Sequence, residues 1–399
     1  MEQVVVTGLG TVSPVGNSVP EFWDSIRNGR SGAGPITRFD TAEFATNYAA
    51  EVKNFDPRER IDRREARKMD RFSHYAAYAA IEALEDAGIK PKGGIYDSDR
   101  TGVILGVGIG GFETIESSIG TLIEKGPGRV PPMTIPKLIA NIAPAHIAIY
   151  LDAHGPTYSL NTACASGTDA IHNSIRAIRA GEVDLVVTGG VEASITPLGV
   201  SGFNVIQALS TKYADDPTKA SRPFDKDRDG FVMGEGAGIL VLESRRHAEK
   251  RGARIYAEVA GTSMTCDANH LTAPHPEGRG AVEAMKKAIA AAGVEPLEVD
   301  YINAHGTSTP INDPTETKAI KAVFGDHAKK LKVSSTKSMT GHCVGAAGGI
   351  EAVALVLSLR DQFFPATINL DEADSDCDLD YVPNSGRSGE INIGMSNTF

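Results

Sequence analysis

Two widely separated segments of the chain share one design, in which a turn of small residues holds a reactive side chain and leads into a helix. Residues 161–167 (NTACASG) hold Cys164 and precede a predicted helix over residues 168–180. Residues 340–349 (TGHCVGAAGG) hold His342 and precede a predicted helix over residues 350–359. Apolar residues recur at helical spacing in both segments. The repetition predicts a chain built from two similar halves.

Strand-like and helix-like runs alternate along both halves, which predicts α/β layering. We place the first half at residues 1–253 and the second at residues 254–399. After its buried helix the second half has one strand where the first has two, so we expect that one closing strand is missing. The predicted strands are residues 3–8, 101–106, 183–190 and 238–243, then 254–261, 299–304, 332–335 and 391–395; further helices are predicted at 72–87 and 280–292.

The composition excludes several classes of function. No run of about 18 uncharged apolar residues and no signal-like N-terminus occurs, so we predict no membrane segment and a cytoplasmic protein. Four widely spaced cysteines lack zinc or redox spacing, and we predict no metal and no cofactor. The net charge of −11 argues against nucleic-acid binding. A basic run at residues 58–71 is either a solvated helix face or a docking surface for an acidic partner.

Cys164 follows an extended segment, residues 156–160, and stands where a helix is predicted to begin. The unpaired N–H groups of a helix start favour thiolate over thiol, and small neighbours leave the sulfur accessible. An isolated cysteine is nevertheless more often a buried, unreactive residue. The assignment of Cys164 as a nucleophile therefore depends on its partners.

Three candidate partners occupy comparable positions. His305 follows the predicted strand at 299–304, Lys337 lies just past the strand at 332–335, and His342 lies in the second turn. Residues that face ligands in α/β sheets gather at the carboxyl ends of strands. A thiol, two imidazoles and an ammonium group at equivalent ends of two repeated units are what an activated-nucleophile site needs.

Two other motifs are misleading. Residues 106–111 (GVGIGG) fit a dinucleotide-binding pattern, but no acidic residue ends a following strand at the required distance. A glycine-walled cavity is the better interpretation. Residues 225–230 (DKDRDG) resemble a calcium loop, but the closing Glu235 comes one position early and no helix precedes the loop.

With these residues assembled, the chain resembles the elongating, type II β-ketoacyl-(acyl carrier protein) synthases. The resemblance runs from Val4 to Phe399. It rests on residues 4–10 (VVVTGLG), 162–167 (TACASG), 221–236 (SRPFDKDRDGFVMGEG), 303–309 (NAHGTST) and 335–342 (STKSMTGH).

The resemblance implies a thiolase-like fold, with five layers of helix and sheet built from two similar halves, and a homodimer. It implies that Cys164 takes the acyl chain from an acyl carrier protein. It further implies that His305 and His342 flank the malonyl thioester and stabilise the charge of the enolate that forms as CO2 leaves. Lys337 is expected to anchor the local charge network and His342.

The resemblance also implies substrate, docking and cation positions. Gln207 stands where relatives often carry arginine, so one docking contact is expected to differ. The expected substrate residues are Thr307, Thr309, His270 and Thr272 for the pantetheine arm, and Ile109 and Phe203 for the acyl pocket. The expected carrier-protein contacts are Arg64, Arg67 and Lys68. Asn303, Glu351 and Ser396 match residues around a structural cation in some relatives.

Relatives continue past Phe399 with a glycine-rich loop that donates an oxyanion-hole N–H, so we expect a shortened form of a longer chain. A thiolase is a second enzymatic interpretation, disfavoured because Cys377 lies in an acidic, loop-like stretch with no glycine beside it. A non-catalytic partner subunit would lack the nucleophile. A nicotinamide dehydrogenase is the least favoured alternative.

Overall fold

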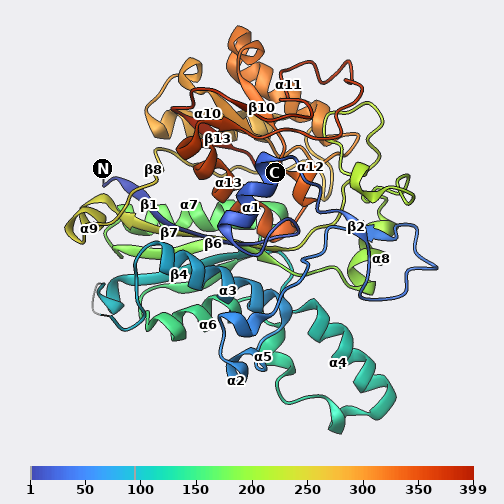
Figure 1. Cartoon of the computed structure of the whole chain (residues 1–399), viewed down its shortest axis with the longest axis vertical. Coiled ribbons are helices and arrows are strands. Elements are labelled where there is room, and N and C mark those ends of the chain that lie inside the picture. Colours follow the sequence, from blue (N-terminus) through green and yellow to red (C-terminus); the bar gives the residue numbers. More distant parts are fainter. Residues whose placement is uncertain (1, 94–95) are drawn as a thin grey trace.

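The computed structural model describes residues 2–93 and 96–399 and arranges them in five alternating layers of helix and sheet (Figure 1). The middle layer consists of two helices, α7 (Ser166–Arg179) and α13 (Ala347–Asp361). Their apolar side chains pack with one face of the larger sheet in a single core cluster. These are the two helices that the repeated sequence design predicts, so the repeat occupies the centre of the fold.

The larger sheet has six strands, and helices cover both of its faces. Strands β1, β4, β6 and β7 are buried along their whole length, as their nearly continuous apolar sequences predict. Helices α3 (Arg71–Asp86) and α6 (Ile142–Leu151) cover the outer face. In sheet order the strands are β5 (Thr157–Leu160), β4 (Thr101–Val107), β6 (Leu185–Glu192), β7 (Gly236–Ser244), β1 (Val4–Val12) and β8 (Ala257–Glu258).

The smaller sheet has three parallel strands. Strand β9 (Tyr301–Asn303) lies between β10 (Lys332–Ser334) and β13 (Gly394–Ser396). Helices α10 (Arg279–Ala292) and α11 (Asn312–Phe324) pack on it in a separate core cluster. The loops that leave the carboxyl ends of β9 and β10 lead to His305 and Lys337, the arrangement that α/β sheets use for ligand sites.

One predicted strand is shorter than expected and pairs with the larger sheet. Of the segment 254–261 only Ala257–Glu258 is a strand, and it pairs antiparallel with β1 of the larger sheet. The flanking N–H groups of Tyr256 and Val259 donate to the carbonyls of Val6 and Val4, each at 2.9 Å. Alternation of apolar and polar residues identifies a strand but does not specify its partner, so the sequence did not indicate that this strand pairs with β1.

The segment after α13 also differs in detail from the prediction. The strand expected at 391–395 begins at Gly394 and ends at Ser396. Two short strands that were not predicted, β11 (Phe363–Phe364) and β12 (Arg387–Ser388), pair with each other outside the two main sheets. Strands this short carry too little periodicity to be recognised in a sequence.

Short elements complete the layers. Helix α1 begins after Ser18, whose hydroxyl accepts the N–H of Glu21, and Pro20 stands in its first turn, both common at helix starts. The short elements are α1 (Val19–Arg27), α2 (Arg63–Ala66), α8 (Pro197–Val205), α9 (Arg245–Lys250), α12 (Lys337–Thr340), β2 (Gly34–Pro35) and β3 (Tyr48–Ala49).

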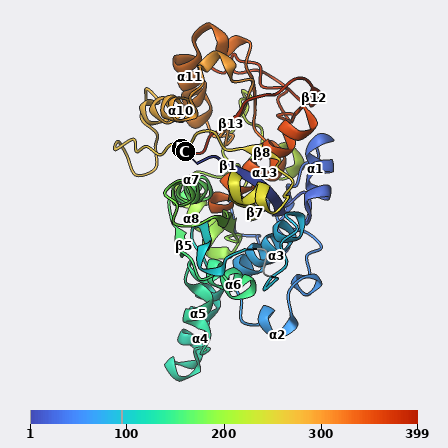
Figure 2. The same cartoon turned by 90° about the vertical axis from the view of Figure 1, so that its left-hand side faces the viewer.

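An arm formed by α4 (Phe112–Lys125) and α5 (Thr134–Leu138) extends away from the layers (Figures 1 and 2). On α4, Ile119, Leu122 and Ile123 are 48%, 45% and 78% exposed. Exposed apolar side chains gathered on one element are typical of a protein contact surface. None of the described helices is long and apolar enough to cross a membrane.

Candidate active site

Cys164 lies in a tight turn between the edge strand β5 and the central helix α7. The turn is a single 3-10 turn, Ala163–Ala165, and Ala163 adopts a positive φ of 50°. Ser166 holds it from the helix side, since its hydroxyl donates to the carbonyl of Ala163 at 2.7 Å and accepts the N–H of Thr162 at 2.9 Å. Positive φ costs energy for a residue with a Cβ, so this turn is strained, and the Ser166 hydrogen bonds help to hold it.

The second turn repeats this geometry. Before α13 stands another 3-10 turn, Val344–Ala346, and Val344 has a φ of 44°. When the two turns are aligned on Ala163 and Val344, Gly345 takes the position of Cys164, and His342 precedes the second turn. A Cβ on Gly345 would lie 2.2 Å from the backbone nitrogen of Gly108, so only glycine fits there.

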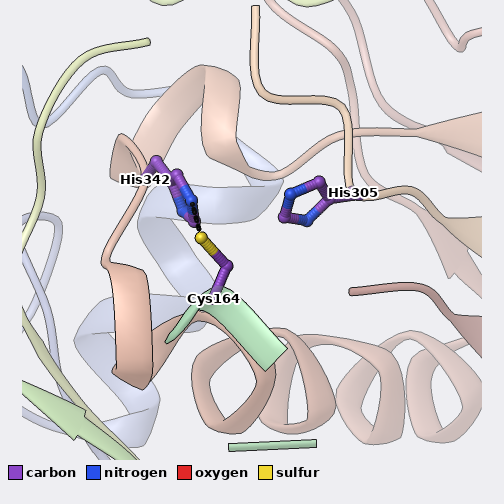
Figure 3. A group of neighbouring side chains, drawn as sticks. All are labelled: Cys164, His305 and His342. Atoms are coloured by element: carbon purple, nitrogen blue, oxygen red, sulfur yellow. Dashed lines mark hydrogen bonds between the residues drawn. The ribbon is translucent and has the colours of Figure 1, made fainter. Parts of the chain in front are cut away.

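The two turns bring Cys164 and His342 together. Nε2 of His342 lies 2.9 Å from Sγ of Cys164. Figure 3 shows the sulfur pointing at the His342 ring, with the His305 ring facing the same space from another segment. The centroids of the two imidazole rings are 5.4 Å apart and the rings are nearly perpendicular. The thiol and both imidazoles thus converge as the sequence predicts.

Glu316 on α11 holds the segment that carries His305. The backbone N–H groups of His305 and Gly306 donate to its two carboxylate oxygens, at 2.9 and 2.8 Å. Asn397 donates to the same carboxylate at 3.2 Å. All of these groups are buried, so the strand-end loop is fixed by charge-assisted hydrogen bonds.

Burial changes the acid–base properties of the three side chains. Burial raises the pKa of the Cys164 thiol to about 11, although the Lys337 charge acts in the opposite direction. Burial, followed by the Lys337 charge, lowers the pKa values of His305 and His342 well below the usual value. Burial and the helix start therefore act on the pKa of Cys164 in opposite directions.

Lys337 is held in a buried ion pair. Its ammonium group contacts a carboxylate oxygen of Glu351 on α13, and the exposed fraction of either side chain is at most 2%. The other oxygen of Glu351 has no hydrogen-bond partner among the described residues. Burial raises the pKa of Glu351 to about 7 against the opposing effect of Lys337. Lys337 also acts electrostatically on both imidazoles and on Cys164.

The residues predicted to bind substrate fall into two groups. Thr307 and Thr309 lie in the loop that begins at His305, and their hydroxyls are hydrogen-bonded to each other at 2.9 Å. His270 and Thr272 lie in an exposed loop, where the Thr272 N–H donates to His270 Nδ1 at 3.2 Å. Within the described chain neither of these two hydrogen-bonds to Cys164, His305 or His342.

Ile109 and Phe203, the predicted acyl-pocket residues, reach the site through intermediates. The N–H of Ile109 donates to buried Glu192 at 3.1 Å. The ring centroid of Phe203 is 5.3 Å from that of Phe231, which in turn lies 5.2 Å from the ring of His342. Phe203 is therefore connected to His342 through the ring of Phe231.

The glycines before Ile109 pack closely instead of lining an open cavity. A Cβ on Gly106 would lie 2.1 Å from the Ser166 carbonyl carbon, and one on Gly108 would lie 2.1 Å from an Oε2 of Glu192. These glycines let β4 approach the start of α7 and the buried carboxyl group. The expected glycine-walled cavity is therefore filled by Ser166 and Glu192.

The predicted docking cations lie on and just after α2. Arg64, Arg67 and Lys68 are all exposed. Lys68 forms an ion pair with Glu65 at 2.7 Å. Within residues 2–93 and 96–399 no carboxylate forms an ion pair with Arg64 or Arg67, so both charges face solvent.

The residues of the expected cation site are only partly assembled. Asn303 and Ser396 are register partners on the paired strands β9 and β13. Glu351 is already engaged by Lys337. The hydroxyl of Ser396 is buried without a partner among the described residues.

Three residues that support the site were not predicted. Glu316 and Glu192 are buried acids, and acidic side chains in a sequence are ordinarily interpreted as exposed. Burial raises the pKa of Glu192 to about 7. The third residue, Phe231, lies within the recognised motif 221–236 and packs against His342. No periodic or spacing signal distinguishes these residues.

Two family models match the chain. The model described as "Beta-ketoacyl synthase, N-terminal domain" matches residues 1–248, and that described as "Beta-ketoacyl synthase, C-terminal domain" matches residues 256–371. The chain is 50% identical over 398 residues to 3-oxoacyl-(acyl-carrier-protein) synthase 2 of Synechocystis sp.. It is 49% identical over 397 residues to the protein of the same name from Coxiella burnetii. Each match covers 100% of this chain and 95% of the relative.

Solved structures show the same fold. The ishigamide ketosynthase/chain length factor matches with a TM-score of 0.92 and 39% identity. A ketosynthase in complex with its type II PKS acyl-carrier protein matches with a TM-score of 0.91 and 35% identity. Both matches cover 100% of this chain and 96% of the other. Together with the layers in Figure 1, these matches confirm the predicted thiolase-like fold.

Proposed function

This chain belongs to the β-ketoacyl synthase family, and on that premise we propose that it lengthens acyl chains by decarboxylative condensation. An acyl group on Cys164 is joined to malonyl-(acyl carrier protein), which gives 3-oxoacyl-(acyl carrier protein) and CO2 in fatty acid elongation. The observation that carries this proposal is the 2.9 Å contact between Cys164 Sγ and His342 Nε2, in a chain half identical to a 3-oxoacyl-(acyl-carrier-protein) synthase 2.

In the first half-reaction the Cys164 sulfur attacks the thioester carbonyl of the acyl carrier. A bond forms between this sulfur and the acyl carbon, the bond to the carrier's pantetheine sulfur breaks, and the thiol proton ends on the departing carrier thiol. Because burial raises the pKa of Cys164 to about 11, that proton needs an acceptor during attack. The neutral Nε2 of His342 is the group best suited by its contact with Sγ.

In the second half-reaction the malonyl carboxylate leaves as CO2, and its bonding electrons form an enolate of the thioester. The enolate carbon attacks the acyl carbonyl on Cys164, a carbon–carbon bond forms, and the sulfur leaves as a thiolate that regains a proton from solvent. Neutral imidazole N–H groups stabilise such an oxyanion in a buried site. His305 and His342, both buried and held by fixed segments, are proposed for this role.

Lys337 is proposed as a positioning residue. Its ion pair with Glu351 fixes the ammonium group, and its charge disfavours protonation of both imidazoles. Neutral histidines can donate to a developing oxyanion and still accept a proton from a thiol. Thr307 and Thr309 are proposed to contact the pantetheine arm because they lie two and four residues after His305 and their hydroxyls are hydrogen-bonded to each other.

The thiolase alternative is not favoured. A thiolase would need a second cysteine in the site, and Cys377 is buried in the core cluster that α10 and α11 form against the smaller sheet. Among the described residues the side chains gathered around Cys164 are His305 and His342, without another thiol.

An acyl carrier protein is the proposed partner, docked at Arg64, Arg67 and Lys68. The two arginine charges face solvent, and acidic partners are attracted to such patches. A second copy of the chain is proposed to cover the α4–α5 arm, because α4 exposes Ile119, Leu122 and Ile123. Strand β5, at the edge of the larger sheet, offers an unpaired edge to the same partner.

The cytoplasm is the proposed compartment. All four cysteines are free thiols, and the reaction needs Cys164 in its reduced form. Reducing compartments keep such thiols available.

The deciding experiment is mass spectrometry of the chain after exposure to an acyl-(acyl carrier protein). We expect a covalent acyl adduct on the peptide that contains Cys164, released when malonyl-(acyl carrier protein) is added. The Cys164→Ala variant should carry no adduct, whereas the exposed-cysteine control Cys266→Ala should be acylated normally. Absence of the adduct from the unmodified chain would refute the function.

A further inference from the structure

The Cys164 site combines donor atoms that also suit a transition metal. Sγ of Cys164 and one ring nitrogen each of His305 and His342 all lie within 4.8 Å of one another. One thiol and two imidazoles are a ligand set that Zn²⁺ accepts with a fourth position open. In the part of the chain that the structure describes, no other histidine, cysteine and carboxylate group is gathered in this way.

The spacing is close to that of a tetrahedral zinc site. Zinc–sulfur and zinc–nitrogen bonds of about 2.3 and 2.0 Å place neighbouring ligand atoms roughly 3.3–3.6 Å apart. Here Sγ and Nε2 of His342 are 2.9 Å apart, slightly too close, and the widest pair is within 4.8 Å. Binding therefore requires side-chain rotations that open the Sγ–Nε2 pair and draw in any pair that lies wider than this range.

The ring nitrogens are not engaged elsewhere. Nδ1 of His305 and Nδ1 of His342 are buried and have no hydrogen-bond partner among the described residues. Among the described residues, the His342 ring hydrogen-bonds to the Cys164 sulfur alone. Neither ring is therefore committed to a structural hydrogen bond that metal binding would break.

The charges around the site do not exclude a dication. The Lys337 charge acts on all three side chains, but Glu351 is paired with it. Glu192 is a further buried carboxyl group whose charge acts on the Cys164 sulfur. A thiolate formed on metal binding would add one more negative charge. Lys337 alone therefore does not exclude a dication.

We propose that Zn²⁺ binds Cys164, His305 and His342 of the free chain and reversibly inhibits it. Binding forms a sulfur–zinc bond in place of the sulfur–hydrogen bond, and the thiol proton passes to solvent, so one proton is released and no electron is transferred. The metal then occupies the sulfur lone pair that attacks the acyl thioester and both imidazole lone pairs. Mg²⁺ and Ca²⁺ prefer oxygen ligands and should not bind here.

An acyl group on Cys164 removes the sulfur ligand. The acylated chain should therefore resist zinc, and zinc should inhibit acyl transfer to Cys164 rather than condensation on an acyl group already bound. This order of events distinguishes the proposal from general precipitation or surface binding of metal.

The test uses the full chain without substrates, in a non-coordinating reductant. Calorimetric titration with Zn²⁺ should give one metal per chain, and Co²⁺ should give the intense absorption of a tetrahedral thiolate site. Zn²⁺ should slow alkylation of Cys164 by iodoacetamide at least tenfold, with exposed Cys266 in the same chain still reacting, and a chelator should restore the rate.

Variants decide which residues hold the metal. Cys164→Ser and His305→Ala should each weaken Zn²⁺ binding at least tenfold, because each removes a ligand. The matched control Cys266→Ser should bind as tightly as the unmodified chain. Unchanged binding in Cys164→Ser, or no protection of Cys164, would overturn the proposal. Neither result would contradict the proposed condensing function, because that function is tested separately by acylation of Cys164 in the absence of metal.

Discussion

Ala163 and Val344 occupy the same backbone position in the two halves of the fold, with φ angles of 50° and 44°. Each is the first residue of a 3-10 turn that leads into a central helix. Positive φ is uncommon for alanine and more so for a β-branched residue, and such positions cost about 1–3 kcal/mol. Both turns around the Cys164 site are thus built on strained backbone that the surrounding packing maintains.

Glu316 is expected to matter for both stability and rate. Glu316→Ala leaves the buried N–H groups of His305 and Gly306 without acceptors, at about 1–3 kcal/mol each. We expect the free energy of unfolding to fall by about 2–4 kcal/mol and condensation to slow at least tenfold. Glu316→Gln keeps one acceptor oxygen, so its stability and its condensation rate should lie between those of the parent and of Glu316→Ala. Urea unfolding and steady-state kinetics measure these effects, and an alanine variant as stable as the parent would contradict them.

The buried pair of Lys337 and Glu351 should show strong coupling. Lys337→Met leaves the Glu351 carboxylate buried without its counter-ion, which typically costs about 3–5 kcal/mol. The double variant Lys337→Met with Glu351→Leu removes both charges and should recover most of that stability. Denaturant unfolding of both single variants and of the double variant provides the complete cycle. Additive losses would show that the two side chains do not act as a pair.

Carrier-protein docking should depend on Arg67. Arg67→Glu reverses an exposed charge that no described carboxylate pairs with, so KM for an acyl carrier substrate should rise about tenfold or more, most clearly at low salt. Turnover of a short pantetheine thioester should be unchanged. Lys250→Glu on α9 makes the same charge reversal on another surface and serves as the control. Equal effects of both variants would argue against a docking site at α2.

The α4–α5 arm should control the association of two chains. Ile123 is 78% exposed, so Ile123→Glu should leave the fold intact and shift the chain toward the monomer in size-exclusion chromatography with light scattering. Leu271→Glu, at a residue 99% exposed in a loop, is the matched control and should have no effect. A chain that is monomeric before any substitution would refute the proposed dimer.

Glu243 predicts how stability changes in acid. Burial alone would raise its pKa, but hydrogen bonds from Arg251, His247 and Thr7 outweigh burial and lower it from 4.5 to about 2. The ionised carboxylate therefore stabilises the fold fully above about pH 4.5, by about 3 kcal/mol, and this contribution is lost as pH falls toward 2. The stability difference between the parent and Glu243→Gln, measured by urea unfolding, should shrink from pH 6 to pH 2. A constant difference would contradict the shift.

The sequence predicted the layered fold and the Cys164, His305 and His342 cluster because both follow from local signals. Strands buried on both faces have continuous apolar sequences, and turns of small residues precede the two central helices. The sequence could not assign the strand at residues 257–258 to the larger sheet, because strand pairing depends on contacts distant along the chain. It also could not reveal the burial that raises the pKa of the Cys164 thiol, because desolvation depends on the packed structure.

Gly345 makes the two halves unequal. Its position matches that of Cys164, but the backbone of Gly108 occupies the space that any side chain there would need. Of the two repeated turns, only the turn in the first half therefore has room for a side chain at this position. In the other turn Gly345 packs closely against Gly108, and His342 just before that turn lies 2.9 Å from the Cys164 sulfur. One symmetric scaffold thus yields a single, asymmetric catalytic centre per chain.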